Sequence, residues 1–323
     1  MTGIYIKSVS WVIVSFVSLL CNFTAYAALD EFDTSNNIIN TDKIVSGGPR
    51  KDDIPAILKP RFAFGKAALF MKDDDLVVGV SFMDEAKAYP IKVLNWHEIV
   101  NDTLGGASIA VSWCPLTRSG IVFVRQVGKN ILKLGVSGLL YNSNLVMYDT
   151  LTHSLWPQLS QGAVTGKFSG HTLKVLPSMV ATWREWRVKF PNTTVLSPDT
   201  GFIRDYVRDP YEAYHASSKA MFAIDSLDSR LPPKTVVIGV EIDGVSKAYP
   251  LKWIKNIEQP LEDTVGETKI KIYVGSHNTA YIVDENRQLV AATTMYWFAW
   301  SAFHKNTLIF EIEKLLKNTQ SAN

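Results

Sequence analysis

The chain has 323 residues, of which 47% are hydrophobic, 11% aromatic and 20% charged. A chain of this composition can bury an ordinary core, so the composition excludes a disordered protein. The formal net charge is only +2 and no basic block appears in the sequence, which argues against a nucleic-acid-binding surface.

The first 27 residues are expected to form an export signal. Lys7 precedes an apolar run from Val9 to Leu20, and Ala25-Tyr26-Ala27 places small residues at the two positions that a signal peptidase reads. A lipoprotein site at Cys21 is the weaker alternative, because the residue before it is Leu where a small one is expected. No later apolar run approaches the ~20 residues that cross a bilayer. We therefore expect an exported, periplasmic protein whose mature chain has no transmembrane segment.

The chain contains an internal repeat. Residues 77–92 and 237–252 are identical at eight of sixteen positions. The similarity resumes in two further pairs of segments, 102–105 with 263–266 and 183–195 with 297–309. The second copy lacks 47 residues that the first has before its closing helix. This pattern predicts two related lobes from an internal duplication, with the second lobe shortened.

The predicted elements follow this repeat in chain order. Alternating apolar residues around a turn predict a hairpin in each copy, at 76–83 with 86–91 and at 236–242 with 245–251. A short helix at 92–100 and a strand at 108–113 follow in the first copy. That copy alone adds strand-like runs at 120–126, 131–136, 144–149, 162–167 and 172–176. The segment 180–190, which belongs to the repeated closing region, is predicted to form an amphipathic helix. The sum is a strand-rich α+β fold.

The predicted domain organisation follows from these elements. It comprises a signal peptide at 1–27, a polar N-terminal segment at 28–52, a first lobe with the candidate site at 53–197, an inter-lobe segment at 198–232, a shortened second lobe at 233–312 and a tail at 313–323.

Polar residues present in only one copy indicate where chemistry is expected. On its predicted helix the first copy has Asn95-Trp96-His97-Glu98 where the second has Lys255-Asn256-Ile257-Glu258, so Asn95 and His97 are replaced and the glutamate is kept. At the end of its central strand it has Cys114 and Thr117 where the second has Gly275 and Asn278. With Cys21 in the signal, Cys114 is the only thiol of the mature chain. In an oxidising compartment such an odd cysteine is buried, bound to a metal, reactive or paired with another chain.

Cys114 and His97 are the strongest candidates for a pair of catalytic or metal-binding residues. A nearby imidazole can lower the pKa of a thiol or share a metal ion with it. The alternative is that His97 is a hydrogen-bonded core histidine on the inward face of its helix and that Cys114 is a small buried hydrophobe.

Further polar and aromatic candidates for ligand binding lie in the first-copy insertion and in the inter-lobe segment. They are Tyr141, Asn142, Asp149, Trp156, Arg204, Asp205 and Arg208. The glycine, serine and asparagine of 137–143 suit a ligand-facing loop and suit a tight structural turn equally well. The charged residues of 204–209 could bind an anion, although ion pairs that clamp the two lobes together are favoured.

Five long motifs lie across the chain between Asp53 and Phe310. They are AKAYPIKVLNWHEIVNDTLGG (86–106), WCPLTRSG (113–120), GVSGLLYNSNLVMYD (135–149), SLWPQ (154–158) and TGFIRDYVRDPYEAY (200–214). Together they resemble the bacterial domain-of-unknown-function family numbered 3179. The resemblance implies export and a recurring polar constellation, but no reaction. Many members carry a second cysteine where Thr117 stands, so this chain departs from a dithiol or two-thiolate metal mechanism.

Three functions remain open. The first is an exported accessory protein that binds a metal or an unknown small ligand near Cys114 and His97, where a thiolate with an imidazole favours copper or zinc. The second is a thiol-dependent enzyme with Cys114 as nucleophile, His97 as base or ion-pair partner, and Asn95 or Tyr141 as an orienting or oxyanion-stabilising group. The third is a structural protein or one that binds a protein partner.

Overall fold

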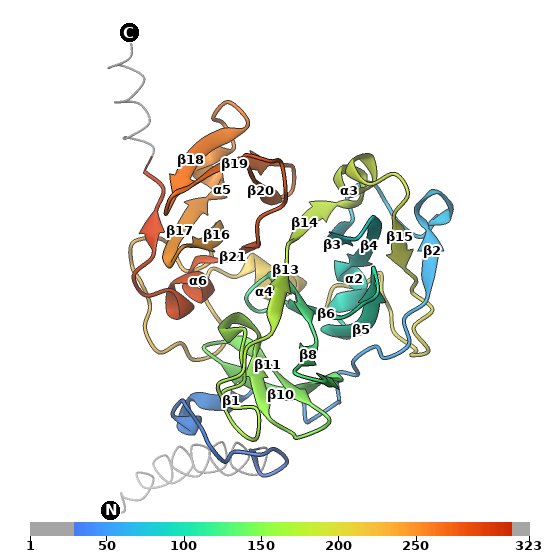
Figure 1. The fold of residues 1–323 in the computed structure, drawn as a ribbon, viewed down its shortest axis with the longest axis vertical. Helices are drawn as coiled ribbons and strands as arrows, with labels where there is room; N and C mark the ends of the chain where they lie inside the picture. The colour runs from blue at the N-terminus through green and yellow to red at the C-terminus, as the bar shows by residue number, and fades with distance from the viewer. Residues whose placement is uncertain (1–28, 312–323) are drawn as a thin grey trace, which may run out of the picture.

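The computed structural model describes residues 29–311, so the predicted signal peptide and the tail at 313–323 lie outside the described residues. Strands dominate this part of the chain, and the few helices are short (Figure 1). The predicted strand-rich α+β class is confirmed. Among residues 29–311, no helix is long and apolar enough to cross a bilayer.

The first half of the chain builds an array of four adjacent strands around the predicted hairpin. Their order is β14 (Ser178–Thr182), β3 (Leu76–Phe82), β4 (Glu85–Pro90) and β15 (Thr194–Leu196). β3 is antiparallel to both of its neighbours, whereas β4 and β15 are parallel. The parallel step is possible because α3 (Trp183–Lys189) lies in the connection between β14 and β15.

The second half builds an array with the same order and orientations. Its strands are β21 (Ala292–Tyr296), β16 (Val236–Ile242), β17 (Val245–Pro250) and β22 (Leu308–Ile309). β16 is antiparallel to both neighbours, and β17 and β22 are parallel. Here α6 (Trp297–Phe303) lies in the connection to the closing strand.

A glycine under a tryptophan recurs in the two arrays. A Cβ atom on Gly79 would lie 2.3 Å from the indole of Trp186, and one on Gly239 would lie 2.2 Å from that of Trp300. Real Cβ atoms do not approach carbon so closely, so each helix packs this tightly only on glycine. Both tryptophans are almost fully buried.

A buried tyrosine bound to an aspartate also recurs. The hydroxyl of Tyr89 donates to Asp102 at 2.7 Å, and the hydroxyl of Tyr249 donates to Asp263 at the same distance. Each aspartate lies on the strand that follows the hairpin and its short helix, so the bond ties that strand to the hairpin in both arrays.

The remaining strands form the other sheets or extend the first array. One sheet contains β5 (Ile99–Leu104), β6 (Ala107–Cys114), β7 (Ser119–Val124) and β13 (Lys174–Leu176). Another contains β1 (Ile44–Ser46), β10 (Leu134–Tyr141), β11 (Asn144–Asp149) and β12 (Leu155–Pro157), and a small ribbon pairs β8 (Gln126–Val127) with β9 (Asn130–Ile131). The first array is extended to eight strands by β2 (Phe62–Phe64), β18 (Leu261–Val265), β19 (Thr268–Val274) and β20 (Ala280–Asp284).

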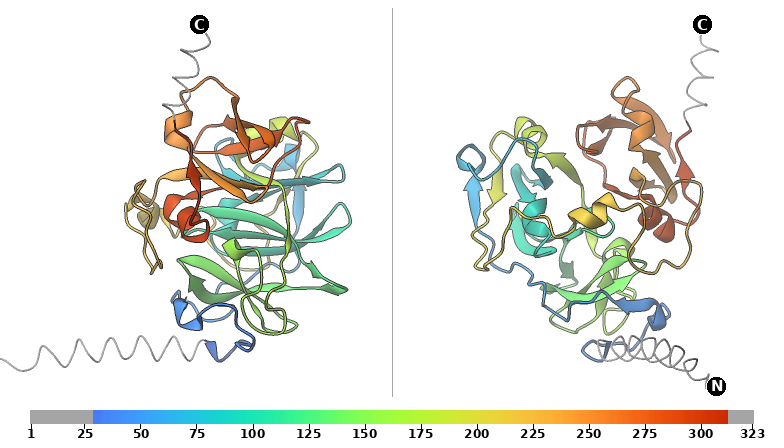
Figure 2. Two further views of the ribbon diagram at one scale, coloured as in Figure 1. Left: turned by 60° about the vertical axis from the view of Figure 1, so that its left-hand side comes forward. Right: turned by 180° about the vertical axis from the view of Figure 1, so that it is seen from behind.

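The two halves are packed against each other. The eight-stranded sheet passes from one half to the other where Val180 of β14 pairs with Ala280 of β20. One hydrophobic core contains both Trp156 of the first half and Trp297 of the second. The short helix α4 (Glu212–Ala216) lies between the halves when the molecule is seen from behind (Figure 2).

Several predicted elements differ from the structure. The helix expected at 180–190 is α3, which begins at Trp183 because 180–182 belong to β14, and the strand expected at 131–136 is divided between β9 and β10. The helix expected at 92–100 is only α2 (Ile91–Leu94), because Glu98 adopts a left-handed backbone conformation and residues from Ile99 onward join the β5 ladder. The strand expected at 162–167 is a loop with a single isolated bridge from Gly162. Gly166 in this loop has a φ of 75°, which is incompatible with an extended strand.

Candidate functional site

Asn95 joins the end of α2 to β6 and to the inter-lobe segment through side-chain hydrogen bonds. This buried residue caps the end of α2, where its Oδ1 accepts a hydrogen bond from the indole of Trp113 at 2.7 Å. Its Nδ2 donates to Asp209 at 2.9 Å. All polar atoms of the amide head are therefore engaged on both sides, and Asn95 positions the inter-lobe segment rather than facing an open site.

The imidazole of His97 is fully buried and has a partner at each nitrogen. Nδ1 lies 2.7 Å from the carbonyl oxygen of Pro55, and Nε2 lies 2.7 Å from the hydroxyl of Tyr206. A carbonyl only accepts, so Nδ1 carries the hydrogen and Nε2 accepts from Tyr206. Burial lowers the pKa of His97 despite the bond to Pro55, which keeps the ring neutral. The ring lies in the turn after α2, not on a helix face.

Glu98 occupies a strained position between α2 and β5. Its φ of 55° is rare for a residue with a side chain, and its carbonyl accepts the backbone N–H of Trp113 at 2.7 Å. The side chain is only 8% exposed. Burial raises the pKa of its carboxyl to about 8, against which the hydroxyl of Tyr211, 3.5 Å from Oε1, acts only weakly. Glu98 therefore holds its proton at neutral pH.

Cys114, at the end of β6, is a buried neutral thiol. Its Sγ accepts the backbone N–H of Leu145 at 3.4 Å. Burial raises the pKa of the thiol and the nearby carboxyl of Glu98 raises it further, while contacts with Thr117 oppose the shift. A reactive cysteine needs the opposite arrangement, in which neighbours lower the pKa. The hydrogen bonds of Cys114 and His97 thus go to different partners, and no hydrogen bond joins the two side chains.

The donor set for copper or zinc is incomplete around Cys114. Among residues 29–311, no three His, Cys, Asp or Glu side chains cluster as a metal-binding group. A structural zinc site normally has four protein ligands and a catalytic one three. With both nitrogens of His97 engaged, Cys114 has no imidazole partner available for such a site.

A small cavity of about 120 Å³ lies beside Glu98. Its walls come from the strand ends, the N-terminal segment and the inter-lobe segment, and they include Gly47, Pro49, Ile54, Glu98, Leu116, Val136, Gly138, Leu139, Leu140, Leu145, Tyr211, Met221 and Phe222. Apart from Glu98 and the hydroxyl of Tyr211, the side chains of this wall are apolar. Leu145, whose backbone N–H binds the thiol of Cys114, links the cavity to the cysteine.

A bulge in β10 shapes one wall of this cavity. The register with β11 shifts between Val136 and Leu139, and Gly138 within the shift has a φ of 77°. A Cβ atom on Gly138 would lie 2.2 Å from the carbonyl oxygen of Pro49. The glycine of the motif at 135–149 is therefore required by backbone geometry, and it lies in a strand rather than in a ligand-facing loop.

Thr117 belongs to a buried polar network behind Cys114. Its Oγ1 lies 2.7 Å from the hydroxyl of Ser119 and accepts from the amide of Asn144 at 3.2 Å. Gln158 accepts hydrogen bonds from both Ser119 and Asn144, at 2.7 and 2.9 Å. These four side chains are almost fully buried and bind one another, so the network fixes the turn after β6 against β11. Asn144 and Gln158 lie within the quoted motifs, yet their role was not foreseen.

Asp149 and Trp156 serve the fold. The carboxylate of Asp149 accepts the backbone N–H groups of Leu151 and Thr152 and the indole N–H of Trp156, at 3.1, 2.6 and 3.0 Å. This pattern closes the turn after β11, and neither residue lines the cavity at Glu98.

Tyr141 and Asn142 lie at the turn between β10 and β11. Tyr141 packs edge-on against Phe303 of α6, with ring centroids 5.8 Å apart. Asn142 has a φ of 50° and accepts the backbone N–H of Asp225 at 2.8 Å. The turn therefore contacts the second half of the chain and the inter-lobe segment, and neither side chain lines the cavity at Glu98.

Three charged residues of the inter-lobe segment make hydrogen bonds that involve the backbone. Arg204 donates to the carbonyl of Ile203, and Asp205 accepts the backbone N–H of Val207. Arg208 contributes its carbonyl, to the indole of Trp96. Within residues 29–311 none of the three charged side chains forms an ion pair, so the expected clamp is not formed by them.

Tyrosines help to hold this segment, together with Asp209, which binds Asn95, and Asp225, which pairs with Lys43. Tyr206 binds His97, Tyr211 binds Glu98, and the hydroxyl of Tyr214 donates to the carbonyl of Leu116 at 2.7 Å. These tyrosines were not among the site residues predicted from the sequence. The available signal was their concentration in one segment that lacks helix or strand periodicity, since a loop held by packing needs large side chains with a polar end.

The family comparison covers most of this arrangement. A model described as "Protein of unknown function (DUF3179)" matches residues 51–290. The chain belongs to this family. The resemblance seen in the sequence motifs is thereby confirmed, and most of the Glu98 cavity lies inside the DUF3179 region, with only Gly47 and Pro49 before it. No curated protein and no solved structure matches the chain.

Proposed function

We propose that this DUF3179 protein binds a small, mainly apolar molecule that carries a carbonyl group, in the cavity beside Glu98. The observation that carries the proposal is a buried glutamate at the wall of an otherwise apolar cavity, where burial raises the pKa of the carboxyl to about 8. Burying such a group without full hydrogen bonding costs free energy, and proteins retain that cost mainly at functional positions. The left-handed backbone conformation of Glu98 lowers the stability of the folded state further at the same residue.

The chemistry of the wall defines the ligand class. Because the hydroxyl of Tyr211 donates to Oε1, the acid proton of Glu98 is free to donate to an acceptor in the cavity. The cavity volume of about 120 Å³ is close to that of an engineered apolar cavity of about 150 Å³ that takes up benzene. A ring of about six carbons with one carbonyl oxygen fits both requirements.

Binding is favoured here over thiol catalysis. The raised pKa of the Cys114 thiol leaves little thiolate at neutral pH, and His97 has no free nitrogen with which to act as its base. The small-ligand part of the first hypothesis is thus retained, and its centre moves from His97 to Glu98. The metal-binding part has no ligand set among residues 29–311.

Cyclohexanone and cyclohexylamine, measured by calorimetric titration, test this proposal. We expect cyclohexanone to bind at pH 6 and to lose affinity as the pH rises through about 8, where Glu98 loses its proton. Glu98→Leu should weaken cyclohexanone about tenfold, the effect of one lost buried hydrogen bond. Glu258→Leu, which alters an exposed glutamate, is the matched control. Preferential binding of the amine, or equal affinity in the Glu98→Leu variant, would contradict the proposal.

We also propose that the protein acts after export. The charged and apolar pattern of the first 27 residues supports this location. Mass spectrometry of the protein recovered from a periplasmic fraction tests it, because cleavage after Ala27 gives a mature chain that begins at Ala28. Recovery of the uncleaved chain in the cytoplasm would refute export.

We further propose that the two arrays descend from one duplicated module. The shared strand order, the glycine under each tryptophan and the tyrosine bound to each aspartate support this origin. Other DUF3179 sequences offer the test. If their two halves align with each other no better than shuffled sequences do, the duplication is wrong.

A further inference from the structure

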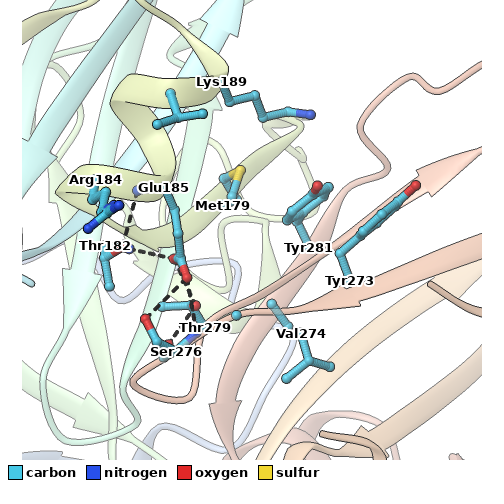
Figure 3. A pocket seen from close by; sticks show the side chains of 13 residues that line it. Met179, Thr182, Arg184, Glu185, Lys189, Tyr273, Val274, Ser276, Thr279 and Tyr281 are labelled. Carbon is cyan, nitrogen blue, oxygen red and sulfur yellow. Dashed lines mark hydrogen bonds between the residues drawn. The ribbon is translucent and has the colours of Figure 1, made fainter. Parts of the chain in front are cut away.

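A second, larger cavity lies between α3 and the strands β19 and β20 (Figure 3). Its volume is about 580 Å³, within the 300–1,000 Å³ range typical of small-molecule sites. Its lining comes from both halves of the chain and shares no residue with the cavity at Glu98. Sites of this kind often form where two structural units meet.

Two parallel tyrosine rings form one side of this cavity. Tyr273 and Tyr281 are cross-strand neighbours on β19 and β20, with ring centroids 4.8 Å apart and an interplanar angle of 7°. Figure 3 shows both rings facing the same space as Lys189 and Met179. Both tyrosines are only partly buried, so the stack retains surface on which a further planar group can pack.

The one carboxylate in the lining is already engaged by hydrogen-bond donors. Glu185 accepts the backbone N–H groups of Thr182 and Ser276, at 2.9 and 3.0 Å, and the hydroxyl of Thr279 at 3.0 Å. Burial alone would raise the pKa of Glu185, but these donors outweigh it and the pKa is lowered. Glu185 is therefore a fixed structural anion that ties α3 to the loop after β19.

The cations of the lining, in contrast, have no acidic partner. Lys189 is exposed, and its ammonium lies 4.8 Å from the centroid of Tyr281. Arg184 also lines the cavity and is exposed. Within residues 29–311 neither side chain forms an ion pair, whereas the neighbouring Arg187 pairs with Asp73 at 2.9 Å outside the cavity. The cavity thus presents positive charge above an aromatic wall.

We propose that this cavity binds an aromatic carboxylate. Its ring would pack against the tyrosine stack and the sulfur of Met179, and its carboxylate would pair with Lys189. A charge-assisted hydrogen bond is about twice as strong as a neutral one, so the negative charge and not only the ring is recognised. This site is independent of the ligand proposed for the Glu98 cavity.

The acid 2-naphthoate and its neutral amide 2-naphthamide, titrated calorimetrically into the full-length protein, test this inference. We expect the acid to bind at least tenfold more tightly than the amide, the effect of about one ion pair in a partly buried site. Lys189→Gln should remove most of this preference. Arg187→Gln is the matched control, because it removes a cation from the same helix that points away from the cavity.

Three results would overturn the inference: no binding of the acid, equal binding of acid and amide, or equal losses in the two helix variants. Glu98→Leu should leave 2-naphthoate affinity unchanged, which separates this site from the first one. Because Lys189 is exposed, its replacement should not alter the thermal unfolding midpoint, and that measurement accompanies each titration.

Discussion

The two halves of this molecule place a glutamate after the same short helix, but in different surroundings. Glu98 follows α2 and is only 8% exposed, whereas Glu258 follows α5 (Leu251–Ile254) and is exposed. The first is covered by Tyr211 of the inter-lobe segment. The two halves share their strand order, yet only the first has a segment packed over its glutamate. The covering segment, and not the shared strand frame, therefore sets the pKa of the carboxyl.

The central strand ends differ in the same way. Cys114 closes β6 in the first half, and Gly275 occupies the matching position after β19 in the second. A Cβ atom on Gly275 would lie 2.3 Å from Oε1 of Glu185. In the second half the carboxylate of Glu185, on α3, occupies the space where a side chain at this position would lie.

The largest expected effect tests what the halves share. Trp186→Ala and Trp300→Ala should each lower the free energy of unfolding by about 3–5 kcal/mol, because each removes a buried indole that packs on glycine. Chemical denaturation measures both. A loss below about 1 kcal/mol in only one variant would break the equivalence of the two arrays.

The second prediction tests what the halves do not share. Burial raises the folded-state pKa of Glu98 from 4.5 to about 8, so the stabilising effect of its proton is complete below pH 4.5 and is lost as the pH rises to about 8. In this window Glu98 should lower the free energy of unfolding by about 1.4 kcal/mol per pH unit.

Glu98→Gln should remove that slope, and denaturation curves between pH 4.5 and 8 measure it. Glu258→Gln removes an exposed carboxyl and should change stability by less than about 0.5 kcal/mol. Parallel pH profiles for wild type and Glu98→Gln would mean that Glu98 is ionised throughout.

The smallest expected effect concerns the cover over Glu98. Tyr211→Phe removes the hydroxyl that lies 3.5 Å from Oε1 and should cost about 1 kcal/mol or less. That hydroxyl lowers the pKa of Glu98 slightly, so the variant should move the midpoint of the pH profile upward. A downward shift would show that Tyr211 does not act on the carboxyl as described.

Much of the frame could be predicted from the sequence. The hairpins were placed within one residue, since strict alternation and a turn residue with positive φ at Asp84 and Asp243 fix their ends. The helix after the first hairpin was predicted too long, because its end depends on the pairing of β5 with β6, a contact that local periodicity does not contain.

The candidate site was predicted only in part. Cys114 was selected because it occurs in one copy only, and Glu98 because it lies beside Asn95 and His97, which the second copy lacks. In the structure Cys114 binds the backbone N–H of Leu145, and Glu98 and Leu145 line the same cavity. The partnership of Cys114 with His97 was predicted because both residues are absent from the second copy and lie near element ends. The partners that occupy His97 are Pro55 and Tyr206, which lie 42 and 109 residues away in the chain and carry no local signal.

The most direct measurement is a carbon-13 NMR titration of the Glu98 carboxyl, assigned with the Glu98→Gln variant. We expect a midpoint near pH 8 that shifts upward when cyclohexanone is bound, since the ligand stabilises the protonated acid. A carboxyl that titrates near its ordinary value of 4.5 and ignores cyclohexanone would contradict the central claim.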